Sequence, residues 1–270
     1  MNDCEKKYIL MSVFIVTVII ILNTVYFRIK KQKINNFIII LSVGIVGYLT
    51  LLKFVGKEAF TNNKSFDVMY INLDKRKDRR DWMEQQLHGW SNVKRINAVD
   101  GNTLNLPELV PHIISQEGKT GADKPNNEKT FGITLTRGAI GCALSHKNAW
   151  SKIKNKPVLI LEDDAKIKCS YKDIHSYLDR APKDWEILYL GSGQYVKGDE
   201  KKPKIYKVKH AYGLFGYIVR PSVVEKMKSV FPLTEQIDTA LNKKGIRAYI
   251  IEPNMVEPRR DMGTNIQIKD

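Results

Sequence analysis

The sequence predicts an α/β fold with an acidic site at the end of one buried strand. Val158 to Leu161 are aliphatic and follow a proline, as in a strand buried on both faces of a parallel sheet. Three carboxylates, Glu162, Asp163 and Asp164, follow this strand directly. Further strand-like segments alternate with segments of helical pattern, which is typical of a sheet covered by helices; these strands are expected at 66–73, 93–99, 185–190 and 248–251.

The acidic triplet is the strongest chemical signal in the chain. Adjacent carboxylates are unfavourable in a crevice unless hydrogen bonds, protonation or a hard cation such as Mg²⁺ or Mn²⁺ offsets their repulsion. A solvated acidic turn is the alternative, and the triplet alone does not decide between the two. Because side chains alternate along an extended chain, Glu162 and Asp164 are expected on one side and Asp163 on the other.

Composition limits the classes of function. The chain has 270 residues, a length that is enough for one full α/β domain with extras. Its net charge is +15. The positive charge suits a nucleotide diphosphate, an acidic acceptor or anionic lipid. Nucleic acid is disfavoured, because the basic residues are scattered and no nucleic-acid-binding motif is found. Cys4, Cys142 and Cys169 form no CxxC pair, so any metal site is expected to be carboxylate-based.

The N-terminal part of the chain predicts a membrane anchor, residues 1–55. Its segments 8–27 and 37–55 are almost wholly apolar, and each is long enough to cross a bilayer core of roughly 30 Å as a helix. A cleaved signal peptide is the alternative for the first segment, but no clear cleavage site follows it and a second apolar run does. The polar residues 56–65 are expected to be a linker.

The orientation of this two-span anchor is only weakly indicated. The basic loop 28–36 between the two spans favours a cytoplasmic loop, which would place the catalytic domain on the exoplasmic or lumenal side. Lysines that flank the spans nearly balance this loop, so the inverted topology stays open.

The first strand of the soluble part leads into a charged helix. Asp74 is expected to cap that helix, whose Arg76 and Arg79 are three residues apart and are able to meet a diphosphate from one face. An ordinary surface helix is the alternative, and this segment alone favours it. The strand at 93–99 ends at Asp100, where a carboxylate either contacts a ribose hydroxyl or shapes the turn.

The middle of the chain predicts a loop and then a helix. Residues 102–136 show little periodicity and are expected to be a long lid or binding loop. A helix is expected over 138–153, with His146 at the margin of its apolar face. A lone histidine there is more often structural than catalytic.

The C-terminal third predicts further alternating elements. They are a helix over 174–178, a charged turn at 198–204, paired strands at 205–208 and 211–219, a helix from Pro221 to Val230, and a helix over 235–246. Asp238 stands in the last of these helices, where an acid either caps, pairs with a lysine or takes part in chemistry.

Four segments taken together resemble glycosyltransferase family 25, which includes lipooligosaccharide and procollagen galactosyltransferases. They are YINLDKRKDRR, RINAVDG, GAIGCALSHKNAW and LILEDDA, in this order, and the resemblance covers residues 67 to about 255. It implies a GT-A fold with a mixed, mainly parallel sheet, and therefore a glycosyltransferase domain at 66–270. The C-terminal tail departs from the family pattern, which leaves acceptor contacts there open.

The resemblance also implies a UDP-sugar donor, often UDP-galactose, with Mn²⁺ (or Mg²⁺) as cofactor and inversion at the anomeric carbon. Its residue roles are as follows: Asn72, Leu73, Arg76 and Arg79 near the nucleotide, Asp100 at the ribose or base, Ser145 and His146 beside the donor pocket, Asp163 and Asp164 on the metal, and Asp238 as catalytic base. Glu162 is the second candidate for the base. We expect Asp164 to be the first carboxylate on the metal.

The resulting prediction is a membrane-anchored, inverting transferase that moves a hexose, with galactose favoured, to a hydroxyl of a glycan or hydroxylysine-type acceptor. That acceptor is carried on a glycan, a protein or a lipid. The alternative is a membrane-tethered scaffold built on an inactive transferase domain. A Mg²⁺-dependent phosphotransferase ranks lower because the chain has no P-loop or kinase-type signature. The sequence predicts no oligomeric state.

Overall fold

The computed structural model of the protein describes residues 66–125, 128–129, 134–259, 261 and 263. The segments expected to cross the membrane, 8–27 and 37–55, and the linker 56–65 lie outside these residues. Within the described part of the chain, no helix combines the length and the apolar character that a membrane span needs.

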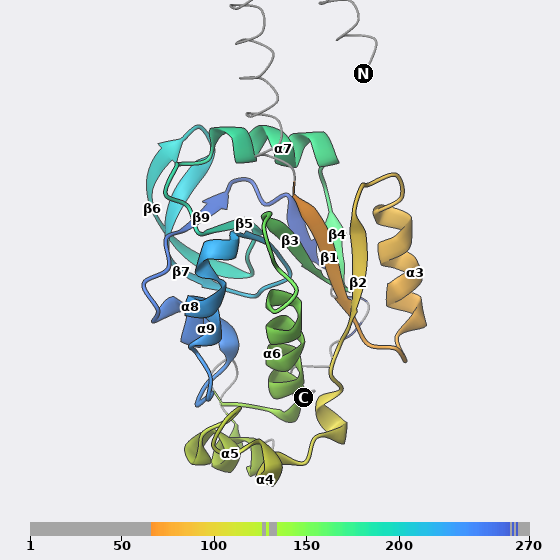
Figure 1. The fold of residues 1–270 in the computed structure, drawn as a ribbon, viewed down its shortest axis with the longest axis vertical. Coiled ribbons are helices and arrows are strands. Elements are labelled where there is room, and N and C mark those ends of the chain that lie inside the picture. The colour runs from red at the N-terminus through yellow and green to blue at the C-terminus, as the bar shows by residue number, and fades with distance from the viewer. Residues whose placement is uncertain (1–65, 126–127, 130–133, 260, 262, 264–270) are drawn as a thin grey trace, which may run out of the picture. The chain divides into compact units, whose positions relative to one another are not determined.

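A mixed sheet of eight strands forms the centre of the described domain (Figure 1). Its spatial order is β2-β1-β3-β8-β5-β9-β7-β6, and all strands run the same way except β7 and β8. The predicted α/β class and mixed, mainly parallel sheet are therefore confirmed. The strands are β1 Asp67–Asn72, β2 Val93–Asn97, β3 Val158–Glu162, β5 Ile187–Gly191, β6 Gln194–Lys202, β7 Ile205–Tyr212, β8 Gly216–Val219 and β9 Ala248–Ile251.

A second, two-stranded sheet pairs β4, Ala165–Ile167, with β10, Val256–Pro258. Because β4 follows β3 after two residues, this small sheet lies next to the acidic end of β3. The backbone N–H of Arg259, just beyond β10, also donates to the carbonyl of Asp164 at 2.7 Å. The C-terminal strand therefore fixes the backbone of the acidic turn.

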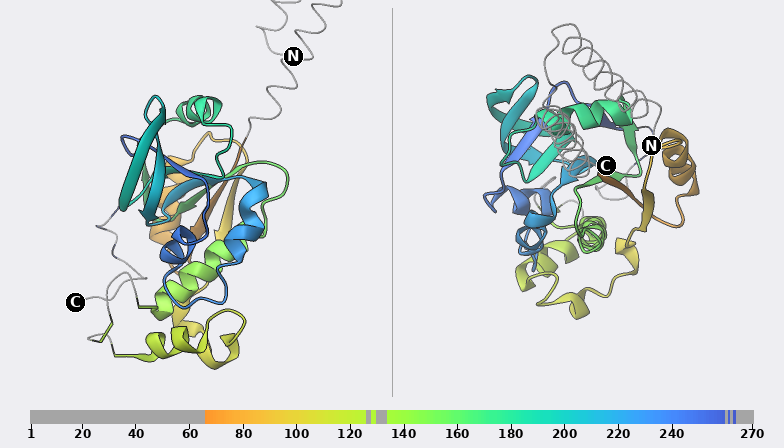
Figure 2. Two further views of the ribbon diagram at one scale, coloured as in Figure 1. Left: turned by 90° about the vertical axis from the view of Figure 1, so that its left-hand side faces the viewer. Right: turned by 45° about the horizontal axis from the view of Figure 1, so that its top comes forward.

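Helices cover both faces of the main sheet (Figures 1 and 2). One core packs α6, α8 and α9 against the sheet, and the other packs α3 and α7 against the opposite face. The helices are α3 Lys77–Gln86, α4 Leu106–Leu109, α5 Gln116–Asp123, α6 Arg137–Trp150, α7 Tyr171–Arg180, α8 Val224–Lys228 and α9 Ile237–Asn242, with 3₁₀ turns at Gly101–Thr103 and Pro221–Val223.

The aliphatic run of β3 belongs to both cores. Val158 and Ile160 face the α6 side, whereas Leu159 and Leu161 face the α3 side, and all four are buried. Alternating side chains on a strand covered from both sides must all be apolar, which explains the continuous hydrophobic run. The prediction of a strand buried on both faces is confirmed, and it places Glu162 where this strand leaves the core.

Three local predictions are wrong. Asp74 does not cap α3: the N-cap is Arg76, without a side-chain hydrogen bond, and Asp74 accepts a hydrogen bond from Arg95 instead. The segment expected to be a long loop contains α4 and α5. Short helices of this kind show too little periodicity to be predicted, although Ser115 caps α5 by accepting from the N–H of Gly118 at 2.9 Å.

The third wrong prediction concerns the strands after residue 193. Of the segment expected to be a charged turn, residues 198–202 belong to β6 and only 203–204 form the turn. β7 pairs with β6 and β9, while β8 pairs with β3 and β5. The chain turns between β7 and β8 at Gly213, which has a φ of +91°. Glycine adopts this left-handed region without steric cost, so the three residues 213–215 separate two strands that the sequence pattern joins.

Gly101 marks a close approach between the 3₁₀ turn after β2 and the start of α6. A Cβ at this position would lie 1.9 Å from the backbone oxygen of Arg137. We therefore expect Gly101→Ala to lower the free energy of unfolding by about 1–3 kcal/mol, measured by urea denaturation of the full chain. Gly198→Ala is the control, because its Cβ would make only an ordinary 3.6 Å contact. Equal stability of both variants would contradict this account of the packing.

Candidate active site

Two neighbouring cavities open where β1 and β3 end. The main cleft, of about 640 Å³, is lined by the ends of these strands, the turn after β2 and one face of α6. It brings together eight residues that the sequence predicts for the site: Leu73, Arg79, Asp100, Ser145, His146, Glu162, Asp163 and Asp164. The side cavity, of about 510 Å³, is lined by Asp238 of α9 and by Gly213, among others. Glu162 and Cys142 line both cavities.

Asp163 is held rigidly by polar partners from β1 and α3. Asn72 donates from Nδ2 to Asp163 Oδ2 at 2.8 Å, and Arg79 donates from Nη1 to Asp163 Oδ1 at 2.6 Å. Asn72 and Asp163 are almost fully buried, and so is the Arg79 guanidinium, whose Nη2 also donates to the carbonyl of Gly263 at 2.6 Å. A buried ion pair with further hydrogen bonds fixes the geometry of the carboxylate.

Asp164 is the carboxylate with unused capacity. Its Oδ2 lies 3.2 Å from Arg79 Nη1, while its Oδ1 is buried and finds no hydrogen-bond partner among the described residues. Burial raises the pKa of Asp164 to about 7, and the charge of Glu162 adds to this rise. A buried acceptor without a partner is costly, and a hard cation is the ligand that offsets both the desolvation and the repulsion. The residues therefore fit a Mg²⁺ or Mn²⁺ ion.

The two aspartates lie together rather than on opposite sides. Arg79 Nη1 contacts both of them, and Glu162 instead faces His146. The prediction that alternation separates Asp163 from Asp164 is therefore wrong. Strand geometry ends at Glu162, and the next two residues form a turn between β3 and β4, where the period of two no longer applies.

The residues predicted near the nucleotide divide into two groups. Leu73 and Asp100 line the main cleft, and the hydrogen bond from Lys75 holds the pKa of Asp100 below its usual range. Asn72 and Arg76 are not among the lining residues. Asn72 positions Asp163, and Arg76 pairs with Asp78 through Nη2 at 2.6 Å.

Ser145 lines the cleft, but its hydroxyl is engaged in structure. Its Oγ accepts from the N–H of Val99 at 2.8 Å and donates to the carbonyl of Gly141 at 2.6 Å. Gly141 itself packs against the backbone of Val99 and Gly101. Ser145 therefore ties α6 to the segment after β2 and shapes the wall of the main cleft.

Asp238 faces the side cavity from the first turn of α9. Its Oδ2 accepts from the N–H of Gly213 at 3.0 Å, and its Oδ1 accepts from the N–H of Thr239 at 2.8 Å. Burial is the main cause that raises the pKa of Asp238 above its ordinary value, and these backbone hydrogen bonds oppose the rise. Gln236, and not Asp238, is the N-cap of α9. An oriented, partly desolvated carboxyl group of this kind is suited to proton transfer.

A different set of ligands, Cys142, His146 and Glu162, also has its ligand atoms within 4.8 Å of one another. Burial raises the pKa of the Cys142 thiol well above its ordinary value, so this side chain is a neutral thiol. The thiolate is the form that binds metal ions, which makes this set a poorer fit than the aspartates.

Sequence reasoning missed Tyr217 of β8 and the role of Trp150. Both are fully buried and hydrogen-bonded to each other, and Tyr217 also contacts His146. The only indication in the sequence was that His146 and Trp150 are one helical turn apart, which places them on the same side of the helix. Nothing in the sequence indicated a role for Tyr217, because a tyrosine in an apolar strand is indistinguishable from an ordinary core residue.

The fold and the site together define a class of protein: an α/β domain with an acidic turn at the end of a central strand. A second carboxyl group lies in an adjoining cavity. A family model described as "Glycosyltransferase family 25 (LPS biosynthesis protein)" matches residues 66–258. The chain therefore belongs to glycosyltransferase family 25.

Curated relatives agree with this membership. The chain is 28% identical over 236 residues to human procollagen galactosyltransferase 2, covering 76% of this chain and 37% of the relative. It is 27% identical over 242 residues to procollagen galactosyltransferase 1 of Danio rerio, covering 78% and 39%. It is also 26% identical over 190 residues to human inactive glycosyltransferase 25 family member 3, covering 63% and 30%. The match thus spans well under half the length of these relatives.

Among solved structures, the domain is similar to UDP-glucose pyrophosphorylase complexed with UDP-glucose. The TM-score is 0.36 at 14% identity, and the match covers 74% of this chain and 77% of that one. A likeness of this degree carries no argument about the site.

Proposed function

We propose that the protein is a metal-dependent, inverting glycosyltransferase that moves a hexose, with galactose favoured, from a UDP-sugar to an acceptor hydroxyl. The observation that carries this proposal is the buried, unpartnered oxygen of Asp164, which lies beside Asp163 and Arg79 in the main cleft of a family 25 domain. The main cleft is concave and brings several polar side chains together, as a small-molecule site does.

Asp164 and Asp163 would hold the cation. When bound, a divalent cation supplies charge stabilisation for the departing nucleotide diphosphate. Asn72 and Arg79 keep Asp163 oriented, so the carboxylate pair is in place before the substrate arrives. Asp100 is ionised, because hydrogen bonds from Lys75 and from the N–H of Asn102 lower its pKa, and it lines the main cleft, where it would accept a further hydrogen bond from a ribose hydroxyl.

The acceptor hydroxyl would lose its proton to Asp238 in the side cavity. A single displacement with inversion needs a base on the side opposite the leaving group, and Asp238 faces a cavity that adjoins the main cleft. Its raised pKa brings the group closer to the operating pH, where a general base is most effective. Glu162, which lines both cavities, is the second candidate for this role.

The proposal includes membrane attachment through residues 8–27 and 37–55, with the catalytic domain on the exoplasmic or lumenal side. It also includes an acceptor on a glycan, a protein or a lipid. The support is the apolar character of these segments and the names of the procollagen galactosyltransferase relatives.

A membrane-tethered binding protein built on an inactive domain is the second candidate. The relatives named as inactive family members favour it. The retained acidic cluster speaks against it, because mutually repelling buried carboxylates are costly without a function.

A donor screen tests the proposal. The purified full chain is incubated with a panel of UDP-sugars, with and without Mn²⁺, and UDP release is measured. We expect Mn²⁺-dependent release with at least one UDP-hexose, favouring UDP-galactose. No metal-dependent turnover with any donor would contradict the proposal and support the inactive alternative.

A further inference from the structure

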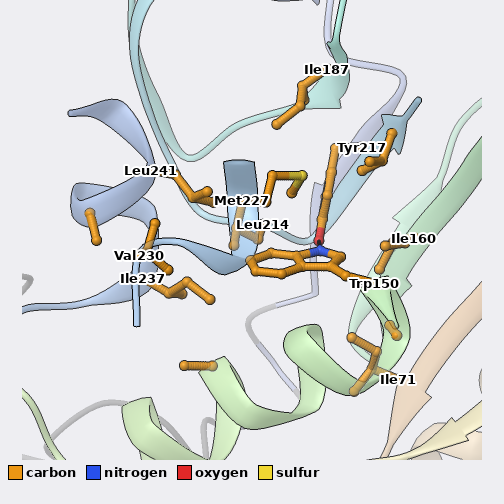
Figure 3. Close-up of a cluster of buried hydrophobic side chains, with 14 of the residues drawn as sticks. Ile71, Trp150, Ile160, Ile187, Leu214, Tyr217, Met227, Val230, Ile237 and Leu241 are labelled. Atoms are coloured by element: carbon orange, nitrogen blue, oxygen red, sulfur yellow. Dashed lines mark hydrogen bonds between the residues drawn. The ribbon is translucent and has the colours of Figure 1, made fainter. Parts of the chain in front are cut away.

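A chain of hydrogen bonds runs through the buried side of the main cleft and ends at Glu162. Trp150 donates from Nε1 to Tyr217 Oη at 2.8 Å, and Figure 3 shows this bond inside the apolar core. Tyr217 Oη lies 2.8 Å from His146 Nδ1, and His146 Nε2 lies 3.2 Å from Glu162 Oε1. Trp150, Tyr217 and His146 are fully buried, whereas the Glu162 side chain is partly exposed to the cavities.

The fold places these four side chains on one face of the sheet. His146 and Trp150 are one turn apart on α6, so they project in the same direction. In the register of β3 and β8, Tyr217 lies opposite Ile160, and Glu162 is two residues beyond Ile160 on the same face. The arrangement is therefore built by two strands and one long helix, with no loop among its parts.

The chain has a fixed direction because its first member is only a donor. The indole N–H of Trp150 has no acceptor capacity, so Tyr217 Oη must accept from it. Burial raises the pKa of Tyr217 well above its ordinary value, so the phenol keeps its proton and donates it to His146 Nδ1. A histidine that accepts at Nδ1 carries its proton on Nε2 and donates it to Glu162.

The reverse arrangement would leave a buried group unsatisfied. If His146 carried a proton on Nδ1, Tyr217 would accept twice, and its own hydroxyl proton would find no acceptor in the described part of the chain. A buried donor without an acceptor is unfavourable, which disfavours this arrangement. The same argument disfavours a metal ion on His146 Nε2, because that nitrogen carries the proton.

We propose that Trp150, Tyr217 and His146 are positioning residues that orient Glu162 to accept a hydrogen bond from a hexose hydroxyl where the main cleft meets the side cavity. This rests on the proposed transferase function. Glu162 Oε1 is occupied by His146, and Oε2 has no hydrogen-bond partner among the described residues. The carboxylate thus has one oxygen fixed to the protein and one oxygen available to the sugar. Glu162 lines both cavities, as a group that contacts the transferred hexose must.

Tyr217→Phe tests the proposal by breaking the chain without changing the shape of the core. We expect kcat to fall about 10²-fold, as for a misplacement of about 1 Å, with little change in the KM of the donor. Tyr189→Phe is the matched control: Tyr189 is also buried, lies opposite Tyr217 in the neighbouring strand β5, and is not a member of the chain. This variant is expected to keep the kcat of the parent protein.

The tautomer of His146 can be measured directly, and a general loss of stability does not change which ring nitrogen carries the proton. In ¹⁵N-histidine-labelled full chain, His146 is identified by the signals lost in His146→Gln. We expect Nε2 to be protonated and Nδ1 to be unprotonated in the parent protein and in Tyr189→Phe. In Tyr217→Phe the preference is expected to be lost. His146→Gln retains an N–H within reach of Glu162 and is expected to be more active than His146→Leu.

The outcomes separate this inference from the proposed function. A protonated Nδ1 in the parent protein would overturn the directed chain whether or not the protein transfers sugar. An unchanged kcat in Tyr217→Phe, with the tautomer lost, would overturn the positioning role. A protein that shows the expected tautomer but no turnover would refute the transferase function, and with it the role of Glu162 towards a hexose, while leaving the hydrogen-bond chain intact.

Discussion

Asp164→Asn is expected to lower UDP-sugar turnover by about 10³-fold. Loss of the charge at the unpartnered oxygen weakens the cation site, and a metal ion contributes several kcal/mol of transition-state stabilisation, with each 1.36 kcal/mol equal to a factor of ten. Steady-state kinetics at several Mn²⁺ concentrations measure the effect. Removal of the metal from the parent protein by a chelator is expected to give a similar loss.

The control for this variant is Asp81→Asn, which removes the same charge from an exposed position on α3. It is expected to leave turnover and its Mn²⁺ dependence unchanged. Full activity of Asp164→Asn at ordinary Mn²⁺ concentrations would show that this carboxylate holds no essential cation.

Asp238→Asn is expected to lower kcat about 10²-fold to 10⁴-fold, with the KM of the donor nearly unchanged. The reason is the loss of the general base, while the donor site in the main cleft stays intact. Glu235→Gln is the matched control, because it removes a carboxylate that pairs with Lys243 outside the side cavity. If Asp238→Asn kept full transfer activity, the base would have to be sought elsewhere, first at Glu162.

The pH profile provides a second check on Asp238. Its raised pKa means that the folded protein holds this proton at pH values where an ordinary aspartic acid is already ionised. As a base it must be ionised, so kcat/KM is expected to fall on the acid side at a higher pH than for an ordinary aspartate. The residual activity of Asp238→Asn is expected to lack this part of the acid limb.

Much of the fold was predictable because its central elements carry strong local patterns. The aliphatic runs of β1 and β3 and the helical pattern of α6 are set by burial, and the structure places all three where the sequence predicts them. Local patterns do not determine which strands pair. The β6 and β7 hairpin is polar and largely exposed, so its sequence resembles a charged loop and a broken strand.

The site was predictable to the extent that its residues stand at strand ends. Glu162, Asp163 and Asp164 were found because they stand at the end of a buried strand. Strand order brings the two aspartates to Arg79, and Glu162 to His146. The turn after Glu162 determines that Asp163 is fixed by Asn72 and Arg79 while Asp164 keeps an oxygen without a hydrogen-bond partner among the described residues. Side-chain alternation along a strand does not apply in this turn, so it predicts the wrong orientation of the two aspartates. The partner of His146 is Tyr217, 71 residues away, and no local pattern encodes a hydrogen bond across that separation.

The central claim is that the acidic end of β3 holds a cation through which the protein binds a nucleotide diphosphate. Isothermal titration calorimetry of UDP into the full chain, with and without Mn²⁺, tests it most directly when the parent protein and Asp164→Asn are compared. We expect the parent protein to bind UDP much more tightly with Mn²⁺ than without it, and Asp164→Asn to lose most of this difference. Equal binding of UDP with and without Mn²⁺, or no binding under either condition, would contradict the claim.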